Sequence, residues 1–180
     1  MGATTTLVTV PEFFAMPEPE GERLELIGGE IVSMSFGHIP HEVVKKNITK
    51  ILVLWLAQNS PAELFAETMY RVNDHNALMP DLSVLFPGRI TPGSIGWIQG
   101  APELAIEVVS SEPAARLEKK IGLYLAHGGK SVWAVYPDER IVRVSDRTRV
   151  SKIFGDSEPL TDPAVLPGFS VPTSAIFEGV

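Results

Sequence analysis

The stretch Leu104-Ala105-Ile106-Glu107-Val108-Val109 decides the fold, because it is dense in aliphatic residues over the length of one strand. Residues 113–127 follow it with apolar side chains at helical spacing, Pro113 in the first turn and Gly128-Gly129 beyond the end. Residues 132–136 then predict a second apolar strand. This succession of strand, helix and strand is typical of a parallel crossover.

The rest of the chain predicts two more helices and several short strands. Thr9 and Glu12 form a capping-box pattern for a short helix that ends near residue 17, and a long helix is expected from residue 38 or 41 to about residue 58. The tail from residue 166 is rich in proline and glycine, so we expect it to be irregular with a final turn. Strands are expected at 23–27, 30–35, 64–66, 69–72, 82–86, 141–145 and 150–154.

The predicted class is α/β in the broad sense (α+β). Because only one parallel crossover is visible, we expect a mixed sheet flanked by helices rather than a doubly wound sheet. The 180 residues contain no repeat and no long polar linker, so residues 1–180 are expected to form a single domain. A chain of this length can bury roughly 70% of the surface that its unfolded form exposes, which is enough for a core of its own.

The composition and the missing motifs exclude several classes of protein. The absence of cysteine rules out disulfides, thiol catalysis and cysteine-based metal sites. We see neither a secretory signal pattern nor an apolar run of membrane-spanning length, so we expect a cytoplasmic protein that does not enter a membrane. Phosphate-binding loops, dinucleotide-binding glycine patterns, zinc-protease motifs and nucleophile elbows are also missing. The chemistry that remains is that of acids, histidines and lysines.

The net charge of −7 arises from 15 Lys and Arg against 22 Asp and Glu. The first 30 residues carry −5 of it, which leaves −2 for the other 150 residues. Such a chain is not expected to bind nucleic acid tightly through a broad basic surface. A basic cluster nevertheless lies between residues 140 and 152, where it fits either an exposed hairpin face or a local groove facing phosphate. Its members are Arg140, Arg143, Arg147, Arg149 and Lys152.

Two acidic residues interrupt predicted strands. Asp81 opens one strand directly after Pro80, and Glu107 lies in the middle of another. A desolvated carboxylate must meet a cation, a proton or hydrogen-bond donors, so both positions suggest chemistry. The alternative for Glu107 is that it faces water on a half-buried strand, together with Ala105 and Val109 on the same side.

The spacing of these acids resembles the PD-(D/E)XK nuclease superfamily, in which two carboxylates on neighbouring strands hold a divalent ion. The wider pattern resembles the Uma2 (DUF820) family of restriction endonuclease-like proteins over about residues 8–177, which implies a restriction endonuclease-like core. The matching blocks are Arg23-Leu24-Glu25-Leu26-Ile27-Gly28-Gly29-Glu30, His41, Pro80-Asp81-Leu82, Glu107-Val108-Val109-Ser110, Lys120 with Tyr124, and Leu166-Pro167-Gly168-Phe169.

The resemblance implies that Asp81 and Glu107 are catalytic metal ligands, with Mg²⁺ or Mn²⁺ as the ion. Hard oxygen ligands suit these hard cations. The superfamily pattern has a lysine two residues after the second acid, where this chain has Val109. The Uma2-like pattern offers Lys120 from the following helix as the third catalytic residue. Lys119 is the competing choice, because adjacent helical residues point about 100° apart and only one can face the site.

Glu25 and His41 also match family positions, and would support the site by binding the water shell of the ion or by moving a proton. Each has an alternative role: Glu25 could pair with a nearby Lys or Arg, and His41 could cap its helix or be a satisfied interior histidine. The chain departs from the family after Glu107, where it reads Ser110-Ser111-Glu112-Pro113 in place of Ser-Pro-Ser, and at Arg116, where an acid is common.

These residues together predict a metal-dependent endonuclease that hydrolyses phosphodiester bonds of DNA. One alternative is a catalytically silent nuclease-fold module that binds nucleic acid or self-associates. Another is a two-carboxylate hydrolase such as a glycosidase, which leaves Lys120 without a role. By analogy we expect a homo-oligomer such as a dimer, since cutting both strands of a duplex needs two sites.

Overall fold

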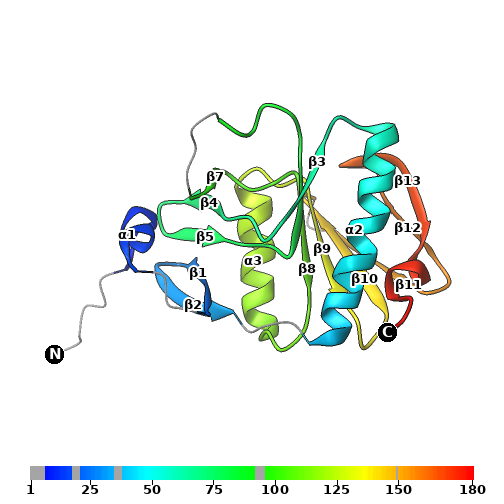
Figure 1. Cartoon of the computed structure of the whole chain (residues 1–180), viewed down its shortest axis with the longest axis horizontal. Coiled ribbons are helices and arrows are strands. Elements are labelled where there is room, and N and C mark those ends of the chain that lie inside the picture. Colours follow the sequence, from blue (N-terminus) through cyan, green and yellow to red (C-terminus); the bar gives the residue numbers. More distant parts are fainter. Residues whose placement is uncertain (1–6, 18–20, 35–37, 92–95, 149) are drawn as a thin grey trace.

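The computed structural model describes residues 7–17, 21–34, 38–91, 96–148 and 150–180, and Figure 1 shows how they are arranged. Each predicted helix and strand has a counterpart within a few residues of its expected position. The helices are α1 Val10–Ala15, α2 Ile39–Asn59, α3 Ala114–Ala126 and the 3-10 helix η1 Thr173–Phe177. The strands are β1 Arg23–Ile27, β2 Glu30–Met34, β3 Glu63–Ala66, β4 Tyr70–Asn73, β5 Asn76–Leu78, β6 Leu82–Leu85, β7 Ile98–Gln99, β8 Leu104–Val108, β9 Ser131–Tyr136, β10 Ile141–Asp146, β11 Ser151–Gly155, β12 Pro159–Asp162 and β13 Leu166–Pro172. Ser35, the predicted end of the second strand, lies outside the described residues.

The largest sheet has six strands in the order β11-β10-β9-β8-β6-β3. β8 and β9 run parallel, with Glu107 opposite Ala134, and α3 connects them. The other neighbouring pairs of this sheet are antiparallel. The predicted crossover and the predicted mixed sheet are therefore both confirmed.

Helices α2 and α3 cover opposite faces of this sheet. Leu104 of β8 belongs to the same hydrophobic cluster as Val44 of α2, whereas Ala105 belongs to the cluster of Ile121 on α3. Because side chains alternate along a strand, Glu107 shares the face of Ala105 and lies on the side of α3. It is only 4% exposed. The interpretation that Glu107 faces water is therefore wrong, because a helix covers that face.

Helix α2 is the longest helix and lies along the six-stranded sheet (Figure 1). Its buried residues recur at helical spacing, and they are His41, Val44, Ile48, Leu52 and Leu56. Within the part of the chain that the structure describes, no helix combines the length and the hydropathy needed to cross a membrane.

A second sheet has the order β2-β1-β5-β4-β7 and contains the predicted hairpin of β1 and β2. Gly28 and Gly29 join these strands with φ angles of 66° and 78°, a region that glycine adopts without strain. Helix α1 packs on this sheet through Val10. The predicted capping box is present, since the side chain of Thr9 accepts from the Glu12 amide and the side chain of Glu12 accepts from the Thr9 amide.

The C-terminal segment differs from the prediction of an irregular tail. Residues 166–172 form β13, which pairs antiparallel with β12 in a two-stranded sheet. Pro167 and Pro172 are tolerated there because an edge strand leaves some backbone groups unpaired. Trp133 Nε1 of β9 donates to the buried carboxylate of Asp162 on β12 over 2.8 Å, which attaches this small sheet to the large one.

Candidate active site

The two predicted metal ligands lie at the same end of adjacent strands. Asp81 immediately precedes β6, and Glu107 lies on β8, with Leu82 opposite Ile106 in the antiparallel register. One step further along this register, Asp81 comes opposite Glu107. The Val108 amide donates to Asp81 Oδ2 over 2.7 Å, which fixes this carboxylate against the strand that carries Glu107.

Lys120 reaches Glu107 from α3, the helix of the crossover. Its Nζ lies 2.9 Å from each carboxylate oxygen of Glu107 and 3.1 Å from Glu25 Oε1, and the side chain is 1% exposed. One turn later, the Tyr124 hydroxyl donates to Glu107 Oε1 over 2.8 Å. Lys119 is exposed. Of the two lysines left open by the sequence, Lys120 is therefore the one that faces the carboxylates.

Glu25 approaches the same ammonium group from β1, a strand of the other sheet. Its Oε1 accepts from the Met79 amide over 2.7 Å, and the residue is buried. The alternative that Glu25 pairs with a nearby cation is thus correct, and the cation is Lys120. Glu25 therefore pairs with a cation and lines the site at the same time.

His41 approaches Asp81 from the first turns of α2. Its Nε2 lies 3.1 Å from Asp81 Oδ1, and its Nδ1 lies 3.1 Å from Glu42 Oε1. The N-cap of α2 is His38, so the alternative that His41 caps its helix is wrong. His41 contacts Oδ1 of Asp81 while the Val108 amide donates to Oδ2, so each oxygen of this carboxylate has its own partner.

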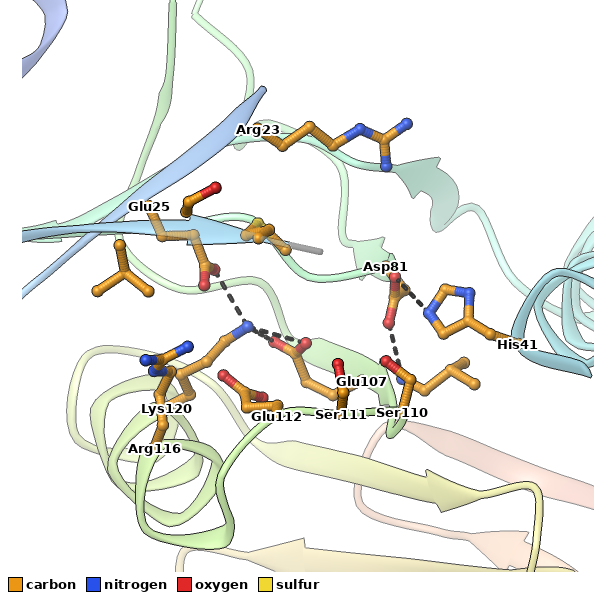
Figure 2. A pocket seen from close by; sticks show the side chains of 14 residues that line it. Arg23, Glu25, His41, Asp81, Glu107, Ser110, Ser111, Glu112, Arg116 and Lys120 are labelled. Atoms are coloured by element: carbon orange, nitrogen blue, oxygen red, sulfur yellow. Dashed lines mark hydrogen bonds and ion pairs between the residues drawn. The ribbon is translucent and has the colours of Figure 1, made fainter. Parts of the chain in front are cut away.

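All five predicted site residues line one pocket, which receives residues from both sheets and from α2 and α3 (Figure 2). The cavity measures about 210 Å³. Sequence reasoning gave no role to several other lining residues, which include Arg23, Ser110, Ser111, Glu112 and Arg116. Their positions in the sequence could have indicated them. Arg23 lies two residues before Glu25 on the same strand, and the other four lie between Glu107 and Lys120.

The buried carboxylate of Glu107 has an unusual proton affinity. Burial is the main cause that raises the pKa of Glu107 to about 8, with Lys120 opposing it and with Glu25 and Asp81 adding to it. Burial lowers the pKa of Lys120, but the charges of Glu107 and Glu25 outweigh burial and leave it raised. Lys120 therefore remains an ammonium ion at neutral pH, beside an excess of carboxyl groups.

The neighbouring groups are also perturbed. Burial lowers the pKa of His41, but its contacts with Asp81 and Glu42 outweigh burial and raise the pKa above its ordinary value. Burial, followed by the charge of Glu107, raises the pKa of Tyr124, so its hydroxyl stays protonated and donates. Burial likewise raises the pKa of Glu112 against the opposing charge of Lys120.

The donor set fits the divalent ion that the resemblance implies. Asp81 and Glu107 offer carboxylate oxygens at facing positions of two strands, and such oxygens are the preferred ligands of Mg²⁺ and Mn²⁺. Among the described residues, no group of three or more His, Asp or Glu side chains gathers as a complete ligand set. An ion held by two carboxylates would keep several waters, as Mg²⁺ usually does in proteins that act on phosphates.

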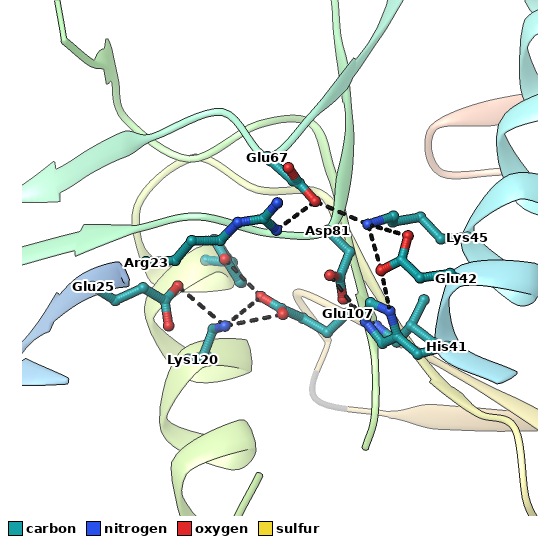
Figure 3. A network of polar contacts seen from close by, with 11 residues as sticks. Arg23, Glu25, His41, Glu42, Lys45, Glu67, Asp81, Glu107 and Lys120 are labelled. Atoms are coloured by element: carbon teal, nitrogen blue, oxygen red, sulfur yellow. Dashed lines mark hydrogen bonds and ion pairs between the residues drawn. The ribbon is translucent and has the colours of Figure 1, made fainter. Parts of the chain in front are cut away.

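A chain of charged side chains leads away from His41 to Arg23 (Figure 3). Glu42, which contacts His41, accepts from Lys45 over 2.9 Å. Lys45 also donates to Glu67 Oε1 over 2.9 Å, and Arg23 donates to the same oxygen over 2.5 Å. Sequence reasoning missed this network, which joins α2, the segment after β3, and β1.

Glu67 is the centre of that network. It has a φ of 49°, a left-handed backbone conformation that is uncommon outside glycine. Its amide donates to the carbonyl of Asp81 over 3.2 Å. Burial raises the pKa of Glu67, but the hydrogen bonds from Lys45 and Arg23 outweigh burial and lower it below the ordinary value. Glu67 is therefore ionised at neutral pH.

The described members of the basic cluster, Arg140, Arg143, Arg147 and Lys152, do not line this pocket. Arg140 pairs with Asp156, and Arg143 pairs with Glu118 on α3. Arg149 lies outside the described residues. Arg147 donates to the carbonyls of Gly128 and Gly129. Of the two interpretations of this cluster, the hairpin face fits its described members, since these three arginines bind other groups of the protein.

A mixed sheet with two carboxylates on neighbouring strands and a buried lysine from the crossover helix places the protein in the class with the restriction endonuclease-like fold. The chain belongs to the Uma2 family, described as "Putative restriction endonuclease", whose family model matches residues 10–174. The predicted family and fold class are thereby confirmed.

A solved structure of the same fold supports this assignment. The crystal structure of "a putative nuclease belonging to DUF820 from Anabaena variabilis ATCC 29413" matches with a TM-score of 0.83 and 24% sequence identity. The match covers 94% of this chain and 97% of that chain. At this identity the likeness shows the fold. None of the curated proteins matches the chain.

Proposed function

We propose that the protein is a metal-dependent endonuclease that hydrolyses phosphodiester bonds of DNA. The observation that carries this proposal is the convergence of Asp81, Glu107 and Lys120 on one pocket, from two adjacent strands and the crossover helix. Membership of the family described as "Putative restriction endonuclease" supports the same reaction class.

In this proposal Asp81 and Glu107 hold a Mg²⁺ or Mn²⁺ ion. Such an ion supplies Lewis acidity when bound, which polarises a phosphoryl oxygen and lowers the pKa of a coordinated water. The backbone amide of Val108 and the ring of His41 fix the Asp81 carboxylate from two sides. The Tyr124 hydroxyl fixes Glu107 in the same way. Both ligands are thus held in place before an ion arrives.

Lys120 acts as the group that stabilises charge on the phosphate. Glu107 and Glu25 keep its ammonium ion protonated. Lys120 therefore donates hydrogen bonds and does not act as a base. A water oxygen bonds to phosphorus while the bond from phosphorus to the leaving oxygen breaks. The water gives up one proton to solvent, and the leaving oxygen takes one up, so that a phosphate monoester and a hydroxyl are formed. Lys120 offsets the negative charge that develops in between.

The test is cleavage of plasmid and single-stranded DNA in Mg²⁺ or Mn²⁺ by the wild type and by Asp81→Asn, Glu107→Gln and Lys120→Met variants. We expect each variant to lose activity by about a hundredfold or more, because Asp81 and Glu107 would hold the metal ion and Lys120 would offset charge on the phosphate. Asp138→Asn and Glu139→Gln are matched controls on the exposed turn between β9 and β10, and should keep wild-type activity.

Two results would contradict the proposal. Equal cleavage by the wild type and the pocket variants would show that a contaminant cuts the DNA. Binding of DNA without cleavage under any divalent ion would instead favour the catalytically silent, nucleic-acid-binding module.

A further inference from the structure

We propose that Arg23 binds a phosphate of the DNA backbone beside the reacting phosphodiester, and that Glu67 is the positioning residue that holds its guanidinium there. This inference rests on the proposed endonuclease function and adds a substrate-binding group to it.

Arg23 is placed at the mouth of the pocket. It lies on β1 two residues before Glu25, so both side chains leave the strand on the same face and line the same cavity. The side chain of Glu25 is 1% exposed, whereas that of Arg23 is 40% exposed. Figure 2 shows Arg23 at one edge of the group of lining side chains, whereas the Lys120 ammonium group lies between Glu25 and Glu107. A strand of DNA that reaches Asp81 and Glu107 would therefore pass Arg23.

The charge of the pocket calls for such a group. Four carboxyl groups line it, from Glu25, Asp81, Glu107 and Glu112. A phosphodiester is an anion, so those of the four groups that are ionised repel it unless cations line its path. An arginine guanidinium suits this role because its planar fork of N–H donors matches the oxygens of a phosphate.

Glu67 determines where the guanidinium lies. One oxygen of Glu67 accepts from both Arg23 and Lys45, and the Glu67 amide is bonded to the carbonyl of Asp81. Glu67 thereby connects Arg23 to the backbone of a proposed metal ligand. The left-handed conformation of Glu67 is costly for a residue other than glycine, and the surrounding contacts hold it in place.

Simple electrostatics and positioning predict opposite effects at Glu67. If only charge mattered, Glu67→Gln would tighten DNA binding, because it removes a negative charge near the path of a polyanion. If Glu67 positions Arg23, the same change weakens binding, because the guanidinium is no longer held at the pocket.

The experiment measures the affinity of the full chain for a short DNA duplex across a range of salt, with Ca²⁺ replacing Mg²⁺ to slow cleavage. We expect Arg23→Gln to weaken binding. It should also reduce the slope of the logarithm of the association constant against the logarithm of the salt concentration by about one, as expected for the loss of one phosphate contact. Glu67→Gln should also weaken binding, and the double variant should bind no more weakly than Arg23→Gln alone. Glu63→Gln removes an exposed charge from nearby β3 and is the matched control, which should bind as the wild type does or more tightly.

Arg23→Lys keeps the positive charge but loses the planar pair of N–H donors of the guanidinium. It should therefore keep the dependence of binding on salt and bind DNA more weakly. It also covers the case in which Arg23→Gln fails to fold. An unchanged slope in Arg23→Gln, or equal or tighter binding by Glu67→Gln, would overturn this inference while wild-type cleavage leaves the proposed function standing. Absence of both binding and cleavage in the wild type would overturn the proposed function and the inference with it.

Discussion

The backbone at Glu67 has a measurable cost. Its φ of 49° lies where a side chain crowds the following carbonyl, which glycine avoids. Glu67→Gly and Glu67→Ala both remove the carboxylate, so they differ mainly in this backbone strain. We expect the glycine variant to be more stable than the alanine variant by about 1 kcal/mol, measured by urea unfolding. A less stable glycine variant would show that the left-handed conformation is not strained.

The ion pairs of Glu67 also predict how stability depends on pH. The pKa of Glu67 is lowered in the folded protein, since Lys45 and Arg23 outweigh burial. Its contribution to stability is therefore complete above the unfolded value near 4.5 and is lost as the pH falls through the folded value. Glu67→Gln should lower stability at neutral pH and make it fall less steeply in acid. Thermal unfolding from neutral to acidic pH checks this, and parallel curves for the two proteins would contradict it.

The five site residues could be proposed from sequence because each belongs to a short block that resembles the family. The network of Arg23, Lys45 and Glu67 could not be found in this way. Arg23 and Glu67 are 44 residues apart, and Lys45 and Glu67 are 22 apart, so the contacts depend on how the two sheets and α2 meet. No periodicity within one element carries that information.

At the level of elements, the sequence pattern of β8 predicts the strand but not which of its two faces is buried. Its aliphatic density predicts a strand, but alternation alone leaves Glu107 either buried or exposed. Glu107 is buried because α3 packs over this face of the sheet, where Lys120 and Tyr124 donate to its carboxylate. β5 and β7, with three and two residues, are too short for any periodic signal. β13 escaped prediction because its prolines and glycine are typical of loops.

The hydrogen bond between Trp133 and Asp162 supports the attachment of β12 and β13. Asp162→Ala would leave the buried indole N–H without its partner, so we expect a loss of about 2 kcal/mol in the free energy of unfolding. Asp156→Ala, which removes a surface ion pair with Arg140, is the control and should cost less than about 1 kcal/mol. Equal losses in the two variants would contradict a special role for the buried bond.

The pocket draws on the whole molecule. Glu25 belongs to the five-stranded sheet and Glu107 to the six-stranded sheet, with Asp81 directly before one of its strands. His41 and Lys120 belong to the two long helices. The net charge of −7 argues against tight, nonspecific DNA binding, but two of the negative charges are the proposed ligands of a divalent cation. The sign of the total charge therefore does not decide against a nuclease.

A bound ion should stabilise the folded protein as a whole. At a concentration of Mg²⁺ near a hundred times its Kd, we expect the free energy of unfolding to rise by about 2.7 kcal/mol, or the melting temperature by about 5 to 10 °C. Differential scanning fluorimetry measures this shift. The shift should persist in Asp138→Asn and disappear in Asp81→Asn. An equal shift in both variants would place the ion elsewhere.

The buried contacts of Lys120 have a consequence for motion. To open α3 alone, the protein would have to withdraw the Lys120 ammonium group from Glu107 and Glu25 and leave these buried carboxyl groups without their charged partner, at a cost of several kcal/mol. We therefore expect the backbone amides around Lys120 to exchange with deuterium only when the whole chain unfolds, whereas those of the six-residue α1 exchange early. The side of the pocket that Lys120, Glu107 and Glu25 form would then persist when α1 opens.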